Sequence, residues 1–359
     1  MFSRTNGQGL SLAVALTASL VMGGTAAAST INQNTSWTID RANTTAKYRV
    51  VAYGDSIFAG YMGDLWSVAK RAAPYVEGEY LTKDFNADME VIRRTKSGAR
   101  ADDIYNNKIV YERSYMQATN TRVVMFEMCG NDYLQARSAF TDQTGTCSYA
   151  GLDTALANCT TYMEKAMQAI NTYATTAKAK IIMNVYYPGY NADNVLTNCT
   201  DSATGTKVNK QSKFLPYLAK SNWRACSLAA KYGFQCADSF ADYMGADYDS
   251  NGDGQIDSAA LRYIPGETEA SYVTRITSTL RSTIRDGNTH FANSSTSFDY
   301  IQSDNTHPTY YGGTVGTGSG TSTPTFTDSQ ILSGKNPEWN KTGHERAGWL
   351  MSTMDPTTP

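Results

Sequence analysis

The chain has 359 residues, with 31 Lys and Arg against 33 Asp and Glu, so its formal charge is only -2. That balance argues against a general nucleic-acid binder, which needs a basic surface, and an aromatic content of 11% argues against wholesale disorder. The length suffices for one large domain or two small ones, with a sizeable apolar core.

The first 28 residues have the pattern of a secretory signal peptide. Arg4 is the only charge before a mostly apolar run at 10–22, and small residues up to Ala28 follow. The run is shorter than the roughly 20 apolar residues that a membrane-spanning helix needs, so an anchor is the weaker alternative. We therefore expect a mature chain of residues 29–359, secreted or periplasmic, with no stable membrane anchor.

The middle of the chain alternates expected strands and helices. Four short runs are apolar almost throughout, which favours strands buried on both faces; they lie at 48–53, 89–92, 122–128 and 180–187. Apolar residues three and four apart predict one helix over 152–170 and another over 270–284, the second ended by Gly287. This alternation predicts a three-layer α/β/α sandwich with a mostly parallel sheet.

Six cysteines fit an exported chain, because an oxidising compartment permits disulfides. They are Cys129, Cys147, Cys159, Cys199, Cys226 and Cys236. Six cysteines allow 15 pairings, and short-range pairs such as Cys147–Cys159 and Cys226–Cys236 are sterically possible. None of the spacings is C-x-x-C, so neither a zinc ribbon nor a thioredoxin motif is indicated.

Polar motifs follow three of the expected strands, at the carboxyl ends where parallel sheets carry reactive residues. They are Gly-Asp-Ser at 54–56, Ser-Gly-Ala at 97–99 and Gly-Asn-Asp at 130–132, and Asp-Asn-Thr-His-Pro follows at 304–308. The four motifs in this order resemble those of the SGNH hydrolases, also called the GDSL esterase/lipase family. The resemblance covers most of the mature chain, and it implies a flavodoxin-like form of the sandwich with insertions.

The residue types at these positions suit nucleophilic catalysis. A serine hydroxyl is a poor nucleophile unless a base takes its proton, and Ser56 and His307 are the candidate nucleophile and base. Asp304 could hold the imidazole in the correct tautomer. The resemblance assigns the same roles, and it gives an oxyanion hole to the backbone N–H groups of Ser56 and Gly98 and to the amide of Asn131. The rival Gly-x-Ser-x-Gly motif is absent around Ser56.

Taken singly, each of these residues has a structural interpretation. Ser56 could be the N-cap of the following helix, and His307 could be a structural loop histidine beside proline. The joint occurrence of the motifs favours the catalytic interpretation. We expect Asp55 to brace the turn rather than react, and His290 and His344 to be structural.

Two features depart from the usual family pattern. An insertion at about 309–342, partly rich in Gly, Ser and Thr, separates the histidine motif from Gly343-His344, which we expect to open the last helix. The insertion could form a lid, a substrate wall or a surface excursion. Glu127 is an acid in an otherwise apolar strand, so we expect it either to have a partner or to face the cleft.

Residues 249–257 match the first nine positions of an EF-hand calcium loop, within an insertion at about 240–267. Candidate ligands are Asp249, Asn251, Asp253, Gln255 and Asp257. Position 12 would be Ala260, which cannot ligate, so Glu267 or Glu269 would substitute or the affinity would be weak. We expect a structural calcium ion, with a solvated acidic turn as the alternative.

These expectations describe a secreted serine ester hydrolase of the SGNH type, folded as a single domain and acting as a monomer. It would need no organic cofactor or catalytic metal, and its substrates would be acylated carbohydrates, lipids or small esters. Tyr53, Tyr61 and Trp66 flank the nucleophile and would line its pocket or pack in the core. The alternatives are an acyltransferase with the same triad and a non-catalytic, calcium-stabilised binding protein.

Overall fold

The computed structural model describes residues 30–41, 44–63, 67–245, 258–285, 300–302, 304–310, 342–356 and 358–359. The expected signal peptide lies outside these ranges, as do residues 246–257 of the expected calcium-loop insertion and residues 311–341 of the second insertion. Buried apolar side chains form a hydrophobic core that extends through the described ranges.

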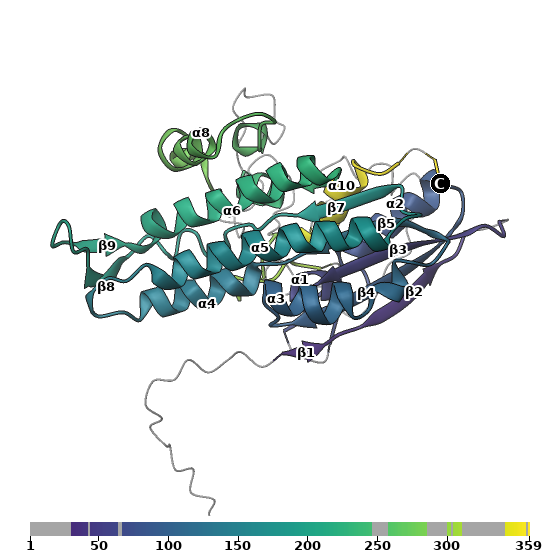
Figure 1. Ribbon diagram of the computed structural model, residues 1–359, viewed down its shortest axis with the longest axis horizontal. Helices are drawn as coiled ribbons and strands as arrows, with labels where there is room; N and C mark the ends of the chain where they lie inside the picture. The colour runs from purple at the N-terminus through teal and green to yellow at the C-terminus, as the bar shows by residue number, and fades with distance from the viewer. Residues whose placement is uncertain are drawn as a thin grey trace, which may run out of the picture.

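A mostly parallel sheet forms the centre of the molecule (Figure 1). Its parallel strands are β4 (Asp88–Ser97), β3 (Lys47–Gly54), β5 (Thr121–Glu127), β7 (Ala179–Met183) and β10 (Gln235–Ala237), in that spatial order. Two antiparallel strands, β1 (Ile31–Asn32) and β2 (Thr35–Ile39), pair with β4 at the edge. The order of the five parallel strands is flavodoxin-like, with its switch point between β3 and β5.

Helices cover both faces of this sheet, so the expected three-layer α/β/α sandwich is confirmed (Figure 1). α2 (Ala73–Asp84) and α10 (Gly343–Ser352) pack together on one face. The other face carries α3 (Ala101–Asp103), the π-helix η1 (Ile104–Val110), α4 (Gly130–Thr141), α5 (Ala150–Tyr173) and α6 (Lys210–Tyr232).

The other described elements are shorter. They are α1 (Ser56–Ala59), η2 (Arg113–Tyr115), β6 (Gly145–Thr146), β8 (Leu196–Thr200), β9 (Lys207–Asn209), α7 (Ser239–Met244), η3 (Ser258–Leu261), α8 (Glu269–Thr274), η4 (Arg275–Thr279) and η5 (Arg281–Thr283). β6, β8 and β9 form a small second sheet, which lies beyond one end of the central sheet in Figure 1.

The apolar runs predicted the existence of β3, β4 and β5, but the second run was too short, because β4 continues beyond residue 92 to Ser97. Helices on both faces leave the centres of β3 and β5 without exposed surface. The fourth run was too long, because β7 ends at Met183 rather than continuing to residue 187. Its neighbour β10 ends at Ala237. Beyond that point the side-chain amide of Asn222 binds both the N–H and the carbonyl of Val185, in place of a neighbouring strand.

The two predicted helices fared differently. The helix expected over 152–170 is confirmed within α5, whose apolar stripe is buried. The helix expected over 270–284 was wrong in extent, because α8 ends at Thr274 and continues as a π-turn and a 3-10 turn. The segment is rich in β-branched residues, which have weak helix propensity. Gly287 lies outside the described residues.

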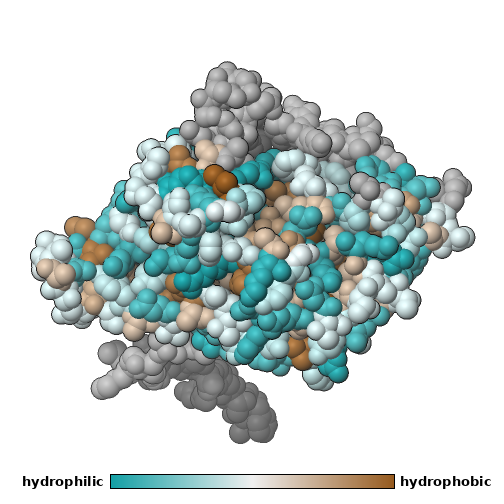
Figure 2. All heavy atoms as spheres, turned by 45° about the horizontal axis from the view of Figure 1, so that its top comes forward, coloured by the Kyte–Doolittle hydropathy of each residue, from teal (hydrophilic) through white to brown (hydrophobic). Residues whose placement is uncertain are grey.

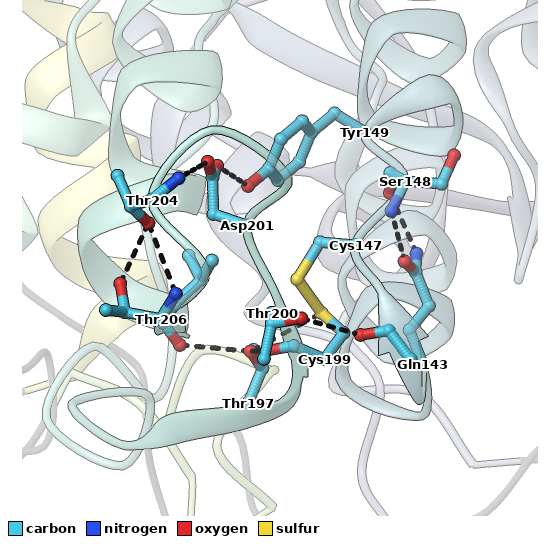
Figure 3. The surroundings of a disulfide bond; sticks show 12 residues. Gln143, Cys147, Ser148, Tyr149, Thr197, Cys199, Thr200, Asp201, Thr204 and Thr206 are labelled. Atoms are coloured by element: carbon cyan, nitrogen blue, oxygen red, sulfur yellow. Dashed lines mark hydrogen bonds between the residues drawn. A yellow bond between two sulfur atoms is a disulfide. The ribbon is translucent and has the colours of Figure 1, made fainter.

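Two disulfides are present in the described residues. Cys226–Cys236 is confirmed and joins α6 to β10. The pair Cys147–Cys159 was wrong, because Cys147 bonds Cys199 and so ties the chain after β6 to β8 (Figure 3). Cys159 is on the buried face of α5, and it remains a free thiol, as does the buried Cys129.

Hydrogen bonds support the Cys147–Cys199 connection (Figure 3). The Tyr149 hydroxyl donates to the Asp201 carboxylate at 2.7 Å, and the Thr200 hydroxyl donates to the Gly145 carbonyl at 3.2 Å. The small sheet is therefore fastened to the start of α5 by one covalent bond and by polar contacts on both sides of it.

None of the described helices is long and apolar enough to cross a membrane. On the face drawn in Figure 2, hydrophobic residues lie in small separate groups among hydrophilic ones. Scattered apolar residues of this kind are normal on protein surfaces.

Candidate active site

The ends of β3, β4 and β5 meet at the switch point of the sheet, where open parallel sheets bind their ligands. Ser56 begins α1 directly after β3, Gly98 follows β4, and Asn131 lies in the first turn of α4 after β5. β3 lies between β4 and β5 in the sheet. The fold therefore gathers the three polar motifs that are far apart in the sequence.

The segment 304–308 brings an imidazole to this edge. His307 Nε2 lies 2.9 Å from Ser56 Oγ, and His307 Nδ1 lies 2.6 Å from Asp304 Oδ2. The Ser56 residue is only 6% exposed, whereas the side chains of His307 and Asp304 are 14% and 37% exposed. A hydroxyl, an imidazole and a carboxylate thus form a continuous chain that is open to solvent at its carboxylate end.

Asp304 is organised to remain ionised. Its Oδ1 accepts hydrogen bonds from the backbone N–H groups of Thr306 and His307. Burial opposes ionisation, but the hydrogen bonds and charge of His307 and these backbone bonds outweigh it, and the pKa of Asp304 lies below its ordinary value. An ionised Asp304 favours the His307 tautomer that carries its proton on Nδ1.

Backbone and side-chain contacts hold the histidine segment in place. The N–H of Gln302 donates to the His307 carbonyl at 2.7 Å, and its side-chain amide donates to the carbonyls of Tyr61 and Pro308. The Tyr61 ring stacks on the His307 imidazole with centroids 4.1 Å apart. Tyr61 therefore flanks the site, whereas Tyr53 is fully buried in the core.

Asp55 rather than Ser56 is the N-cap of α1, since Asp55 Oδ1 accepts the Ile57 N–H at 2.9 Å. The structural interpretation of Ser56 as the cap is therefore wrong, and the expectation that Asp55 braces the turn is confirmed. A capping carboxylate leaves the neighbouring hydroxyl of Ser56 free to face His307.

The groups expected to form an oxyanion hole lie around Ser56. The N–H groups of Ser56 and Gly98 donate no hydrogen bond to any residue that the structure describes. Gly98 has a φ of +77°, which side chains other than glycine rarely adopt. The Asn131 amide already donates to Asp55 Oδ2 at 2.9 Å and to the Ala99 carbonyl at 3.0 Å. Asn131 must therefore release or share one of these hydrogens before it can donate to a bound oxyanion.

Asp132 fastens the loop after β4 to the start of α4. Its Oδ2 accepts the Ala101 N–H at 2.8 Å, and its Oδ1 accepts the Asn158 amide at 2.6 Å. Burial raises the pKa of Asp132 to about 6. These bonds fix the positions of Gly98 and Asn131 relative to each other.

Glu127 fulfils both of the expectations that the sequence left open. Its Oε1 accepts the Asp55 N–H at 2.5 Å, and the residue also lines a cavity beside Ser56. Burial raises the pKa of both Glu127 and Asp55, and the charge of Asp55 raises that of Glu127 further. Sequence reasoning did not foresee that two acids would meet here, although an acid within an apolar strand was the signal.

The cavity extends from Ser56 and Asn131 towards α6 and has a volume of about 590 Å³, including its open mouth. Most of its wall is apolar, formed by Ile57, Met128, Leu134, Met183, Val185, Tyr186, Tyr187, Pro188, Phe214 and Leu218. A mostly apolar cavity with a few polar groups at one end is the usual form of a small-molecule site.

The other two histidines were expected to be structural. His344 is fully buried in α10, and its Nδ1 accepts the Ala73 N–H at 3.3 Å. Burial, with smaller contributions from Arg93 and His307, lowers the pKa of His344 to about 3. His290 and Trp66 lie outside the described residues.

The five candidate calcium ligands also lie outside the described residues, so the calcium site stays a prediction. The two acids considered as substitutes have other partners, because Glu267 pairs with Arg275 and Glu269 pairs with Arg224. Within the described part of the chain, no group of three or more His, Cys, Asp or Glu residues is arranged to hold a metal ion.

No protein-family model and no curated protein matches the chain. The lipase Lip_vut3 from a goat rumen metagenome is 15% identical to it, covering 67% of this chain and 97% of that chain with a TM-score of 0.41. An extracellular lipase from Streptomyces rimosus is 16% identical, covering 66% and 99% with a TM-score of 0.42. A phospholipase A1 from Streptomyces albidoflavus NA297 is also 16% identical, covering 66% and 100% with a TM-score of 0.39.

Proposed function

We propose that this protein is an ester hydrolase of the SGNH type with Ser56 as its nucleophile. The observation that carries the proposal is the chain of contacts from Ser56 Oγ through the His307 imidazole to the Asp304 carboxylate, at 2.9 and 2.6 Å. It lies at the switch point of a parallel sheet, beside an apolar cavity. A hydroxyl, an oriented base and an acid in this arrangement are recognised by their geometry rather than by sequence position.

In the proposed reaction, His307 Nε2 accepts the proton of Ser56 as the serine oxygen attacks the ester carbonyl. Ionised Asp304 stabilises the imidazolium that forms. The oxyanion accepts hydrogen bonds from the Ser56 and Gly98 N–H groups and from Asn131. His307 then protonates the leaving alcohol, and water activated by the same histidine hydrolyses the acyl group from Ser56.

The apolar cavity favours esters whose acyl chain is apolar. Each methylene group transferred from water into such a wall contributes about 0.8 kcal/mol, or about fourfold in kcat/KM. We therefore expect kcat/KM on p-nitrophenyl esters to rise with acyl length until the cavity is filled. Filling the cavity by Leu218→Trp should shift the preferred acyl length to shorter chains. An unchanged preference would show that the cavity does not bind the acyl chain.

Two disulfides and the sequence of residues 1–28 support export of the enzyme. Its substrates would then be esters outside the cytoplasm, such as acylated carbohydrates, lipids or small acyl esters. Protein from the culture medium or periplasm should begin at Ser29, which N-terminal sequencing can establish.

The proposal is tested by assaying the mature protein and two serine variants on p-nitrophenyl esters from acetate to palmitate. Ser56→Ala should lower kcat about 10⁶-fold, whereas Ser138→Ala, on the exposed side of α4, should leave it unchanged. Product analysis with an added alcohol separates hydrolysis from acyl transfer. A folded wild type that is inactive on the whole panel would overturn the proposal in favour of a binding protein.

A further inference from the structure

Glu127, the last residue of β5, lies against the turn at residues 54–56 that carries Ser56. Its carboxyl accepts the Asp55 N–H at 2.5 Å, and a Cβ at residue 54 would overlap its Oε1 atom. The glycine of the Gly-Asp-Ser motif is therefore required by the close approach of Glu127. The contact joins the ends of β5 and β3 beneath Ser56.

The carboxyl groups of Glu127 and Asp55 form a pair without a bonded lysine or arginine in the described part of the chain. The titratable groups that face the pair are Cys129 beside Glu127, Tyr186 after β7 and His307 across the site. Two adjacent buried carboxyl groups cannot both ionise without a large cost, and burial raises the pKa of both.

Asp55 connects this pair to the oxyanion hole. Its Oδ2 accepts the Asn131 amide at 2.9 Å, and its Oδ1 caps the helix that begins at Ser56. The orientation of the Asn131 amide and of the Ser56 N–H therefore depends on where the Asp55 carboxyl lies. The strength with which Asp55 retains the Asn131 hydrogen depends on the charge of Asp55.

We propose that Glu127 is a positioning residue that stays protonated and donates its proton in a hydrogen bond to Asp55. This inference rests on the proposed ester hydrolysis. The bond fixes Asp55, and through it the Asn131 amide, while the pair keeps one negative charge instead of two. A second charge would tighten the hold of Asp55 on Asn131 and repel the developing oxyanion.

The kinetic test compares two substitutions of the same residue. Glu127→Gln preserves a neutral donor of the same shape, so it should keep kcat within about threefold of wild type. Glu127→Ala removes the donor, and misplacement of the amide should lower kcat about 100-fold with little change in KM. Glu164→Gln, an acid on the solvent side of α5, is the matched control and should match wild type.

The pH profile distinguishes positioning from mere packing. Wild-type kcat should fall at alkaline pH as the pair loses its shared proton, whereas Glu127→Gln should keep its activity there because it has no proton to lose. The proposal is overturned if folded Glu127→Gln is as slow as Glu127→Ala, or if its alkaline limb matches that of wild type.

Thermal unfolding supplies a readout that does not depend on catalysis. A buried acid with a raised pKa stabilises the fold fully below the unfolded pKa of about 4.3, and that contribution is lost as the pH rises towards the folded pKa. The melting temperature of Glu127→Gln minus that of wild type should therefore grow above about pH 5, but the difference for Glu164→Gln should not.

If the difference in melting temperature between Glu127→Gln and wild type does not change with pH, the proposal that Glu127 and Asp55 share a proton is overturned. If wild type hydrolyses no ester while the difference still grows with pH, the proposed function fails and the protonated pair remains. The two failures can therefore be told apart.

Discussion

The two described histidines, His307 and His344, lie on segments that touch, yet their surroundings give them opposite properties. His307 sits at a solvent-accessible edge between a hydroxyl and an ionised carboxylate. His344 is fully buried, binds a backbone N–H, and has a pKa of about 3. The first is placed to exchange a proton with Ser56 in the proposed reaction, whereas the low pKa of the second keeps it neutral at physiological pH.

The start of α10, which contains His344, also contacts the segment 304–308 that bears His307 and the residue that follows it. The His344 N–H donates to the Thr309 carbonyl at 3.0 Å, and the Gly343 N–H donates to the Thr309 hydroxyl at 2.9 Å. The start of α10 is itself fixed by a capping box between Thr342 and Glu345. The start of α10 therefore fixes the position of the short segment that bears His307.

Removal of the His307 imidazole should have the largest effect on activity. His307→Ala should lower kcat about 10⁶-fold, because Ser56 loses its base, while the melting temperature changes little. Ester hydrolysis and thermal unfolding measure the two effects. An equal kcat loss in folded His344→Gln would contradict the division of roles.

The next largest effect concerns the acid that orients His307. Asp304→Asn should lower kcat about 10⁴-fold, because an amide favours the wrong imidazole tautomer. The same kinetic assay tests this prediction. A loss below tenfold would mean that Asp304 is only a loop residue.

The contact between the two segments provides a third test. A Cβ on Gly343 would overlap the Tyr300 carbonyl, so Gly343→Ala should displace the segment that bears His307. A shift of about 1 Å costs about 100-fold in kcat. Gly151→Ala, where a Cβ has open space, is the control and should behave as wild type. Equal activity of the two variants would show that α10 does not position His307.

The smallest effect is a pH dependence of stability that comes from His344. Its folded pKa of about 3 lies below the unfolded value of 6.5, so its contribution is present above pH 6.5 and is lost as the pH falls towards 3. Between pH 6.5 and 5 the loss should be about 2 kcal/mol. Denaturant unfolding of wild type and His344→Gln measures it, and parallel curves would show that His344 is not the group responsible.

Much of the fold was predictable from the sequence because it depends on local patterns. Continuous apolar runs indicated β3, β4 and β5, and a clear periodicity indicated α5. The periodicity near 270–284 was misleading, because the segment's β-branched residues form only short helical turns. The strand end at Met183 depends on where β10 stops, which a single run of residues does not reveal.

The site was predictable as a set of motifs but not as a set of contacts. The order of the motifs predicted that Ser56, His307 and Asp304 belong to one site. In the structure their atoms lie within hydrogen-bonding distance. The bond between Asp55 and Glu127 depends on the pairing of β3 with β5, across 72 residues of sequence. The contact between Asp55 and Glu127 and the Cys147–Cys199 disulfide both depend on tertiary structure, so neither was predicted from local sequence patterns.

The most direct test of the central claim is covalent labelling of the native protein with a fluorophosphonate, which reacts with activated serines. Intact-mass and peptide analysis should find one adduct per chain, on Ser56, absent from Ser56→Ala and strongly reduced in His307→Ala. The His344→Gln variant should label like wild type. No adduct on Ser56, or equal labelling of the urea-unfolded chain, would contradict an activated serine at this site.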